Sequence, residues 1–264
     1  MGSGLHIIKI GGNVIDDDVQ LQSFLEKFAA LQGKKVLVHG GGKIATRIAA
    51  DLGIEAKMIN GRRITDKAML DVATMVYAGL TNKHVVSSLQ KFGCDALGLS
   101  GADGNTIKAI KRPVREIDYG YAGDILVDSV NTLSIKKFLE AGFTPVFSAI
   151  THNGLGQLLN TNADTIASAL AVSLAKIYET KLIYCFEKEG VLRDVDNSES
   201  VIKSISPDEF EKLKLEKVIY EGMIPKLDNA FEALSKGVKN VYIGNALNLH
   251  KYQQGEFGTC LLSK

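Results

Sequence analysis

Short apolar runs alternate with segments of helical periodicity along most of the chain. Residues 5–10 and 36–39 are strand-like, and each run is followed by glycines and then by apolar residues spaced three and four positions apart. Neighbouring parallel strands need a crossover connection, and a helix is the usual one. The alternation therefore predicts βαβ units and an α/β fold, with a mainly parallel central sheet sandwiched between helices.

The middle of the chain interrupts this alternation. Residues 106–130 contain β-branched pieces punctuated by Pro113, Gly120 and Gly123, without a helical period. We interpret this segment as β-hairpins that project from the sheet and form a lid. From residue 133 onward helical and strand-like segments alternate again. We expect two lobes, an N-terminal lobe over residues 1–176 and a C-terminal lobe over residues 177–264.

Charge and cysteine content narrow the class of protein. The 31 Lys and Arg nearly balance the 30 Asp and Glu, which argues against a general nucleic-acid binder. The three cysteines form no CxxC pair, which favours a reducing compartment over a zinc site or a disulfide framework. No signal peptide is recognisable, and the longest uncharged stretch, residues 141–163, is broken by proline and glycines. We therefore expect a soluble, cytoplasmic protein.

Two glycine clusters follow the first two predicted strands. They are Gly11-Gly12, directly after Lys9-Ile10, and Gly40-Gly41-Gly42, directly after His39. Ligands bind at the carboxyl ends of parallel strands, where glycine lets backbone N–H groups approach an anion closely. Each cluster alone is equally consistent with a tight turn. Two equivalent clusters favour a shared site for phosphate.

The second cluster also fits GxGxxA, a pattern found in dinucleotide-binding proteins. A nicotinamide-dependent oxidoreductase is therefore an alternative from another class of enzyme. That pattern requires an acidic residue about twenty positions further on to hold a ribose. Residues 59–63 occupy this position and contain Arg62-Arg63 instead. The oxidoreductase interpretation thus lacks its confirming residue.

Two lysines and an arginine pair are candidates for binding anions. Lys9 interrupts an otherwise apolar strand, and Lys226 follows Pro225 in the predicted first turn of a helix, where the helix dipole disfavours a cation. A bound anion would explain both positions, although each lysine could equally reach solvent. Arg62-Arg63 lies in a predicted loop and suits carboxylate capture, or it is a solvated pair.

A polar run precedes the predicted helix over residues 163–175. Asn160, Asn162 and Asp164 could hold a polar ligand there, or Asn162 or Asp164 could simply cap the helix. The five histidines show no metal-ligand spacing, so we expect no metal site on the protein itself.

Taken together, these pieces resemble the amino-acid kinase family, and within it the N-acyl-glutamate kinase branch. The matching segments appear in family order and span nearly the whole chain: Lys9-Ile10-Gly11-Gly12, His39-Gly40-Gly41-Gly42, Asn60-Gly61-Arg62-Arg63-Ile64-Thr65, Asn82-Lys83, Gly156-Gln157-Leu158-Leu159-Asn160-Thr161-Asn162-Ala163-Asp164, Gly222-Met223-Ile224-Pro225-Lys226 and Gly258-Thr259. The resemblance implies the amino-acid kinase fold. It also implies ATP-dependent phosphorylation of the γ-carboxylate of N-acetyl-L-glutamate, a step of arginine biosynthesis, with Mg²⁺ carried on the ATP phosphates.

The resemblance further implies catalytic roles for three residues. Lys9 and Lys226 would neutralise the transferring phosphoryl group, and Asp164 would orient the two lysines. A carboxylate is already an anionic nucleophile, so positioning and charge stabilisation should supply most of the catalysis. The phosphate-binding N–H donors would belong to Gly11, Gly12 and Gly41.

Binding residues are implied in both lobes. In the N-terminal lobe, which would also form the dimer contact, Arg63 would grip the α-carboxylate of the substrate. The rest of that pocket would come from Gly41, Gly42, Asn160 and Asn162. The C-terminal lobe would bind ATP through Glu187, Gly190, Val191, Leu192, Val218, Ile219 and Tyr220.

Some features depart from the family pattern. Phe186-Glu187-Lys188-Glu189-Gly190 replaces a loop that more usually contains Asp, and Arg62 adds a second cation beside Arg63. A second cation suits an extra carboxylate, so N-succinyl-L-glutamate is an alternative substrate, whereas a solvated Arg62 leaves the acetyl substrate. A non-catalytic sensor of the same fold is also conceivable, but both lysines and Asp164 are present. Because Lys9 leaves little room for the N-terminal helix of arginine-inhibited relatives, we expect a homodimer without arginine feedback.

Overall fold

A computed structural model describes residues 4–59, 61–219 and 223–263 of the chain. By its internal contacts the chain divides into two compact units. The first unit comprises Met1–Lys35 together with Leu170–Lys264, and the second unit comprises Val36–Ala169. These units do not coincide with the predicted lobes, 1–176 and 177–264, because residues 1–35 group with the C-terminal part of the chain. The separate roles of the lobes stay a prediction.

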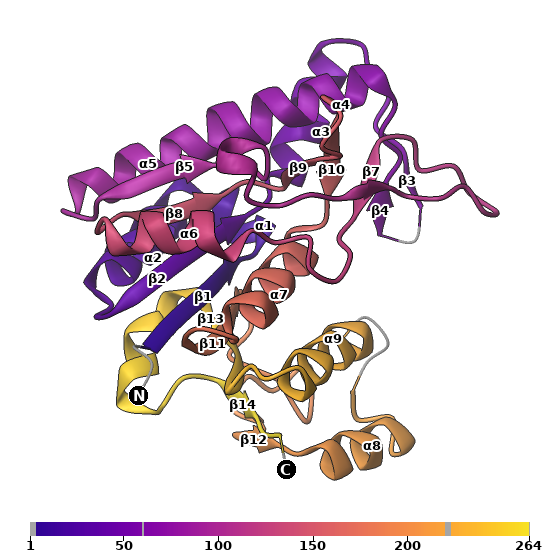
Figure 1. The fold of residues 1–264 in the computed structure, drawn as a ribbon. Helices are drawn as coiled ribbons and strands as arrows, with labels where there is room; N and C mark the ends of the chain where they lie inside the picture. The colour runs from indigo at the N-terminus through magenta and orange to yellow at the C-terminus, as the bar shows by residue number, and fades with distance from the viewer. Residues whose placement is uncertain (1–3, 60, 220–222, 264) are drawn as a thin grey trace. The chain divides into compact units, whose positions relative to one another are not determined.

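The first unit is built on five strands in the order β12-β14-β13-β11-β1 (Figure 1). Only the β13–β14 pair is antiparallel within this group. The strands are β1 (Gly4–Ile10), β11 (Glu179–Phe186), β12 (Ser204–Ile205), β13 (Asn240–Asn245) and β14 (Thr259–Leu261). The helices are α1 (Gly12–Ile15), α2 (Asp18–Ala30), α8 (Pro207–Leu215), α9 (Ile224–Ser235) and the 3₁₀ segment η3 (Ala246–Gln254).

The second unit contains three parallel strands in the order β2-β8-β5 and a smaller four-stranded sheet in the order β6-β7-β10-β9. These strands are β2 (Lys34–His39), β5 (Ala96–Leu99), β6 (Ile110–Lys111), β7 (Ala122–Asp124), β8 (Thr144–Phe147), β9 (Ile150–His152) and β10 (Leu158–Thr161). A short ribbon joins β3 (Met58–Ile59) and β4 (Arg62–Arg63). The helices are α3 (Gly42–Asp51), α4 (Lys67–Thr74), the π-helical η1 (Met75–Thr81), α5 (Asn82–Lys91), the 3₁₀ turn η2 (Asp103–Asn105), α6 (Thr132–Glu140) and α7 (Ala163–Leu174), within which the unit boundary falls.

Helix α2 shows how local sequence sets these elements. Asp17 caps its N-terminus by accepting from the backbone N–H groups of Val19 and Gln20 at 3.0 Å. At the other end the buried Nζ of Lys35 donates to the carbonyls of Phe28, Ala29 and Leu31. The apolar face expected from the periodicity is buried, comprising Leu21, Phe24, Leu25 and Phe28.

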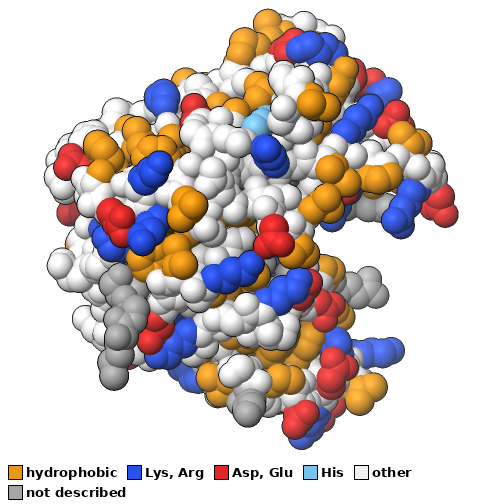
Figure 2. All heavy atoms as spheres, in the orientation of Figure 1, with side chains coloured by type: hydrophobic (Ala, Val, Ile, Leu, Met, Phe, Trp, Pro, Cys, Tyr) orange, Lys and Arg blue, Asp and Glu red, His pale blue; other side chains and the backbone are white. Residues whose placement is uncertain are grey.

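The expected α/β architecture with a mainly parallel sheet is confirmed. Residues 106–130 do contain an antiparallel hairpin, because β6 pairs with β7. Its function as a lid stays a prediction. No helix in the described part of the chain is both long and apolar enough to cross a membrane. On the face shown in Figure 2, basic and acidic side chains lie intermingled over most elements.

Candidate active site

The second unit contains a cavity of about 220 Å³ where both of its sheets end. Several residues predicted to bind substrate line it, namely Gly42, Arg63, Asn160 and Asn162. The structure thus brings together residues that are separated by more than a hundred positions in the sequence. The same cavity is lined by Gly40, Met58, Gly61, Arg62, Tyr77, Arg112, Ala122, Gly123, Ala149, Thr161 and Ala163.

Arg63 is a half-buried cation that lines this cavity. Its Nη2 donates to the Gly42 carbonyl and to Thr46 Oγ1, both at 2.8 Å, so the guanidinium is held against the start of α3. Within the described residues, Arg63 forms no ion pair with a carboxylate. Its charge is therefore available to a carboxylate of a ligand.

Gly41 lies at the N-cap of α3 with φ of +149°, which an L-residue rarely adopts. A Cβ at this position would lie 3.0 Å from Cδ1 of Tyr77. Tyr77 comes from the π-helical turn η1, and π-helical turns are frequent at functional sites. Burial raises the pKa of the Tyr77 hydroxyl, and the neighbouring Arg63 guanidinium opposes part of that rise. The hydroxyl therefore stays neutral beside the cation.

The two asparagines have different surroundings. Asn160, on β10, donates from Nδ2 to Thr65 Oγ1 at 3.0 Å, and Thr65 is buried. Asn162 Oδ1 accepts from the backbone N–H of Thr165 at 3.0 Å, so it does cap α7 while its amide also lines the cavity. Its Oδ1 thus caps the helix, and its role in binding substrate stays a prediction. Asp164 lies in the first turn of α7, and its predicted role of orienting the lysines stays a prediction.

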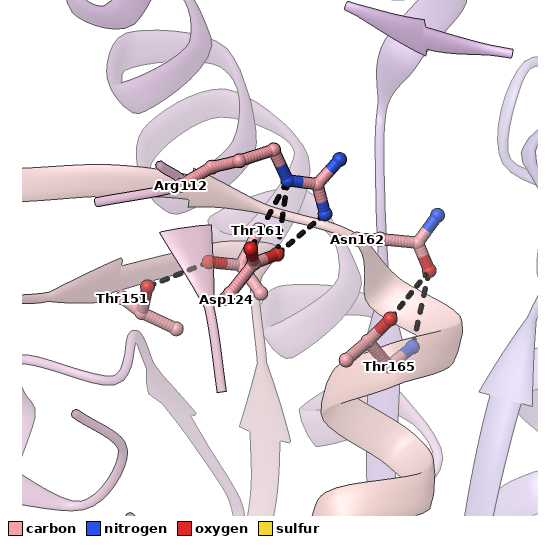
Figure 3. A network of polar contacts seen from close by, with 6 residues as sticks. All are labelled: Arg112, Asp124, Thr151, Thr161, Asn162 and Thr165. Carbon is pink, nitrogen blue, oxygen red and sulfur yellow. Dashed lines mark hydrogen bonds and ion pairs between the residues drawn. The ribbon is translucent and has the colours of Figure 1, made fainter. Parts of the chain in front are cut away.

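Arg112 and Asp124 form an ion pair beside the cavity, and Figure 3 shows the pair above Thr161. The Nε of Arg112 lies 3.1 Å from both carboxylate oxygens of Asp124, and its Nη2 contacts Oδ1. Below the pair, Thr161 and Thr151 share a hydrogen bond of 2.7 Å. These contacts hold the wall of the cavity in place. Gly123 is required in this wall because a Cβ at that position would lie 2.4 Å from Thr161 Oγ1.

A buried histidine fixes the start of the second glycine cluster. Asn82 donates from Nδ2 to the Val146 carbonyl at 2.9 Å and lies 3.0 Å from His39 Nε2. His39 Nε2 must therefore accept, and the proton resides on Nδ1, which donates to the Gly40 carbonyl at 2.8 Å. His39 thus orients Gly40 in its neutral form.

Burial of the His39 ring predicts a loss of stability in mild acid. Burial lowers the pKa of His39 from 6.5 to about 4. Between these pH values His39 is protonated in the unfolded chain but neutral in the folded chain. The free energy of unfolding should therefore be highest above pH 6.5 and should fall as the pH drops toward 4. Between pH 7 and 5, His39 should account for a loss of about 2 kcal/mol. Denaturant unfolding at both pH values measures the loss, to which His6 adds in the same direction. Histidine NMR signals provide the direct check, since titration of the His39 ring near pH 6.5 would contradict this prediction.

The first unit holds the other glycine cluster and both lysines. Lys9 is buried on β1, and Gly11 donates from its backbone N–H to the Cys185 carbonyl at 2.9 Å. A Cβ on Gly11 would lie 3.3 Å from that carbonyl and from the Phe186 ring, so only glycine lets the backbone pass freely. Lys226 lies in the first turn of α9, as expected. Both ammonium groups lie over the Phe186 ring, with Nζ to centroid distances of 5.1 Å for Lys9 and 4.2 Å for Lys226.

A second cavity, of about 370 Å³, lies in the first unit. Of the predicted ATP-binding residues, Gly190, Val191, Leu192, Val218 and Ile219 line it. Tyr220 falls outside the described residues, as does Gly222 of the motif before Lys226. The cavity is also lined by residues that were not predicted to bind ATP: Lys188, Arg193, Asp194, Val195, Lys217 and Met223.

The loop that departs from the family pattern is firmly held. Glu187 accepts a hydrogen bond from Asn13 Nδ2 at 2.7 Å, beside the first glycine cluster. Although it was predicted to bind ATP, it does not line the 370 Å³ cavity. Glu189 accepts from the side chains of Asn245 and Asn248, both at 2.8 Å. The carboxylates of Glu187 and Glu189 thus hold the loop next to the cavity.

The residues of the first unit fit a nucleotide with its phosphates. The cavity supplies apolar walls from Val191, Val218 and Ile219, and Lys9 and Lys226 supply positive charge near Gly11. No group of three His, Cys, Asp or Glu among the described residues could hold a metal ion. The role of Mg²⁺ on the phosphates stays a prediction.

Sequence reasoning missed Tyr77, Arg112 and Phe186. Tyr77 occupies a long helical stretch, where an aromatic side chain is usually part of the core. Arg112 lies in the irregular segment between β-strands, and its relation to the cavity depends on the pairing of β6 with β7. The departure at residues 186–190 was the one available signal for Phe186.

Comparison with known proteins gives consistent matches. A model of the amino acid kinase family matches residues 4–245. The acetylglutamate kinase of Bacteroides fragilis is 51% identical over 250 residues, covering 95% of each chain. That of Cytophaga hutchinsonii is 52% identical over 246 residues, covering 93% of this chain and 92% of the relative. The crystal structure of smu.665 from Streptococcus mutans is 27% identical with a TM-score of 0.77, covering 98% of this chain and 99% of the other.

Proposed function

Because the chain belongs to the amino acid kinase family, we propose that it transfers the γ-phosphoryl group of ATP to the γ-carboxylate of N-acetyl-L-glutamate. The products are N-acetyl-L-glutamyl 5-phosphate and ADP, and the reaction belongs to arginine biosynthesis. The observation that carries the proposal is Arg63, a half-buried cation that lines a cavity and pairs with no carboxylate among the described residues. The dinucleotide-dependent oxidoreductase has no comparable support.

The acyl-glutamate is held by the second unit in this proposal. Arg63 binds the α-carboxylate with the guanidinium N–H groups that Gly42 and Thr46 do not use. Asn160 and Asn162 offer amide groups to the rest of the molecule, and the N-terminus of α3 at Gly41 favours negative charge. The γ-carboxylate remains ionised, so it needs no general base.

The phosphoryl group is stabilised by the first unit. A γ-carboxylate oxygen forms a bond to the γ-phosphorus while the bond to the bridging oxygen of ADP breaks, so negative charge spreads over the transferring group. Lys9 and Lys226 neutralise that charge. The backbone N–H of Gly12 donates to it, whereas the N–H of Gly11, predicted to do the same, already donates to the Cys185 carbonyl. Mg²⁺ carried on the ATP phosphates supplies additional positive charge when bound.

An assay of ADP release with N-acetyl-L-glutamate as the acceptor tests this proposal. We expect ADP release that depends on both substrates, together with an acyl phosphate that hydroxylamine traps as a hydroxamate. L-Glutamate, which lacks the acyl group, is the matched control substrate. ADP release without an acyl-glutamate, or no hydroxamate, would contradict the proposed reaction.

One observation favours testing N-succinyl-L-glutamate as a second candidate. Arg62 and Arg112 line both the substrate cavity and a neighbouring cavity of about 590 Å³. If the acetyl substrate is the correct one, its kcat/KM exceeds that of the succinyl substrate, and Arg62→Ala leaves their ratio unchanged. A higher kcat/KM for the succinyl substrate that falls selectively in Arg62→Ala would replace the acetyl group in the proposal. Arg47→Ala, an exposed arginine on α3, is the control.

We also propose a homodimer that acts in the cytoplasm. Free Cys94, Cys185 and Cys260 support a reducing compartment. Light scattering on the purified protein measures the oligomeric state, and a monomer or a hexamer would contradict the dimer.

A further inference from the structure

Phe186 contacts both of the lysines to which the proposed function assigns charge stabilisation. The Nζ of Lys226 lies 4.2 Å from the centroid of its ring, and the Nζ of Lys9 lies 5.1 Å from it. A cation within about 6 Å of an aromatic ring is attracted by the negative face of the ring. A single ring thus contacts both cations, one from β1 and one from the first turn of α9.

Strand register accounts for this arrangement. Lys9 on β1 is the parallel partner of Tyr184 on β11, so the two side chains share one face of the sheet. Phe186 is two residues beyond Tyr184 and lies on that same face, and the two rings stack with centroids 6.1 Å apart. The Phe186 ring is thereby fixed on one side by Tyr184.

The backbone of the first glycine cluster fixes the ring on another side. A Cβ at Gly11 would lie 3.3 Å from Cδ1 of Phe186, so the ring packs directly against the first glycine cluster. The Phe186 ring therefore contacts the glycine backbone and both ammonium groups at once, so a shift of the ring would affect all of them.

An aromatic ring attracts cations without adding a formal charge of its own. Two ammonium groups near each other repel, and the negative face of a ring offsets part of that repulsion. The ring would act alongside Asp164, whose predicted role is to orient the same lysines.

We propose that Phe186 is a positioning residue that holds Lys9 and Lys226 for phosphoryl transfer through cation–π contacts. This inference rests on the proposed function, because the lysines have a catalytic role only if a phosphoryl group is transferred. Phe186 itself touches no reacting atom in this proposal.

A graded series of variants measures the contribution of the ring face. Fluorination weakens the negative face of phenylalanine with little change in shape, so kcat should fall stepwise for mono-, di- and trifluorophenylalanine at position 186. Phe186→Leu should lower kcat about tenfold or more, with KM for the acyl-glutamate within twofold of wild type, and Phe186→Tyr should restore kcat. Phe92→Leu is the matched control, since Lys91 lies 5.2 Å from the centroid of that ring in the second unit.

An NMR measurement separates this inference from the proposed function. The ε-methylene signals of Lys9 and Lys226 should show upfield ring-current shifts that disappear in Phe186→Leu, with assignments taken from Lys9→Arg and Lys226→Arg. Absent shifts, or a kcat that is flat across the fluorinated series, would overturn the positioning role. If the shifts are present but wild type does not phosphorylate the acyl-glutamate, the proposed function fails while the contacts themselves stand.

Discussion

Replacing Lys9 with methionine is expected to lower kcat by about 10²–10³-fold, the usual cost of removing one group that stabilises transition-state charge. Methionine keeps the length and apolar character of the side chain, so the buried position on β1 can still be filled. The ammonium group near Gly11 is lost, and the charge on the transferring phosphoryl group is left partly uncompensated. Because Lys9 is placed to stabilise the charge as it is redistributed in the transition state, KM should change much less than kcat.

Lys35 supplies a matched control for this substitution. It is buried like Lys9, but its Nζ donates to three carbonyl groups at the end of α2. Lys35→Met should therefore lower the free energy of unfolding by about 2–4 kcal/mol and leave kcat near the wild-type value. Steady-state kinetics and denaturant unfolding of both variants distinguish the two roles. Near-wild-type turnover in Lys9→Met would show that Lys9 is a structural lysine.

The main elements of the fold could be predicted because residues that face the core are apolar and recur at a spacing typical of a helix or a strand. The strand-like runs at residues 5–10 and 36–39 and the apolar spacing that follows each glycine cluster predicted β1, β2, α2 and α3 to within a few residues. Strands β9 and β10 were missed because each is short and contains threonine, histidine or asparagine. The π-helical turn η1 has no local signature, since its extra residue per turn is stabilised by packing around Tyr77.

Sequence reasoning located parts of the site but not the contacts among them. Glycine clusters after strands and the isolated Lys9 are local features, so they could be recognised directly. Asn162 both caps α7 and lines the cavity. This double placement depends on the orientation of its side chain, which the sequence alone does not specify. The approach of Lys9 to Phe186 depends on the register of β1 with β11, which the period of each strand alone does not specify.

Removing the guanidinium of Arg63 is expected to have the second large effect, this time on substrate binding. Arg63→Ala should raise KM for the acyl-glutamate about a hundredfold, since a charge-assisted pair with a carboxylate contributes about 2–3 kcal/mol. KM for ATP should stay within about threefold, because the residues predicted to bind ATP belong to the first unit. Initial-rate kinetics with each substrate varied in turn measures this difference.

Arg63→Lys refines the same prediction. Lysine keeps the charge but cannot reproduce the planar fork that reaches Gly42, Thr46 and a ligand carboxylate together, so its KM should lie between wild type and Arg63→Ala. Arg47→Ala, on the exposed side of α3, should behave as wild type and controls for loss of positive charge in general. If Arg63→Ala raised both KM values equally, the arginine would be acting through the folding of the second unit. A rise confined to the acyl-glutamate would support an α-carboxylate at Arg63, because a general loss of folding would also raise the KM for ATP.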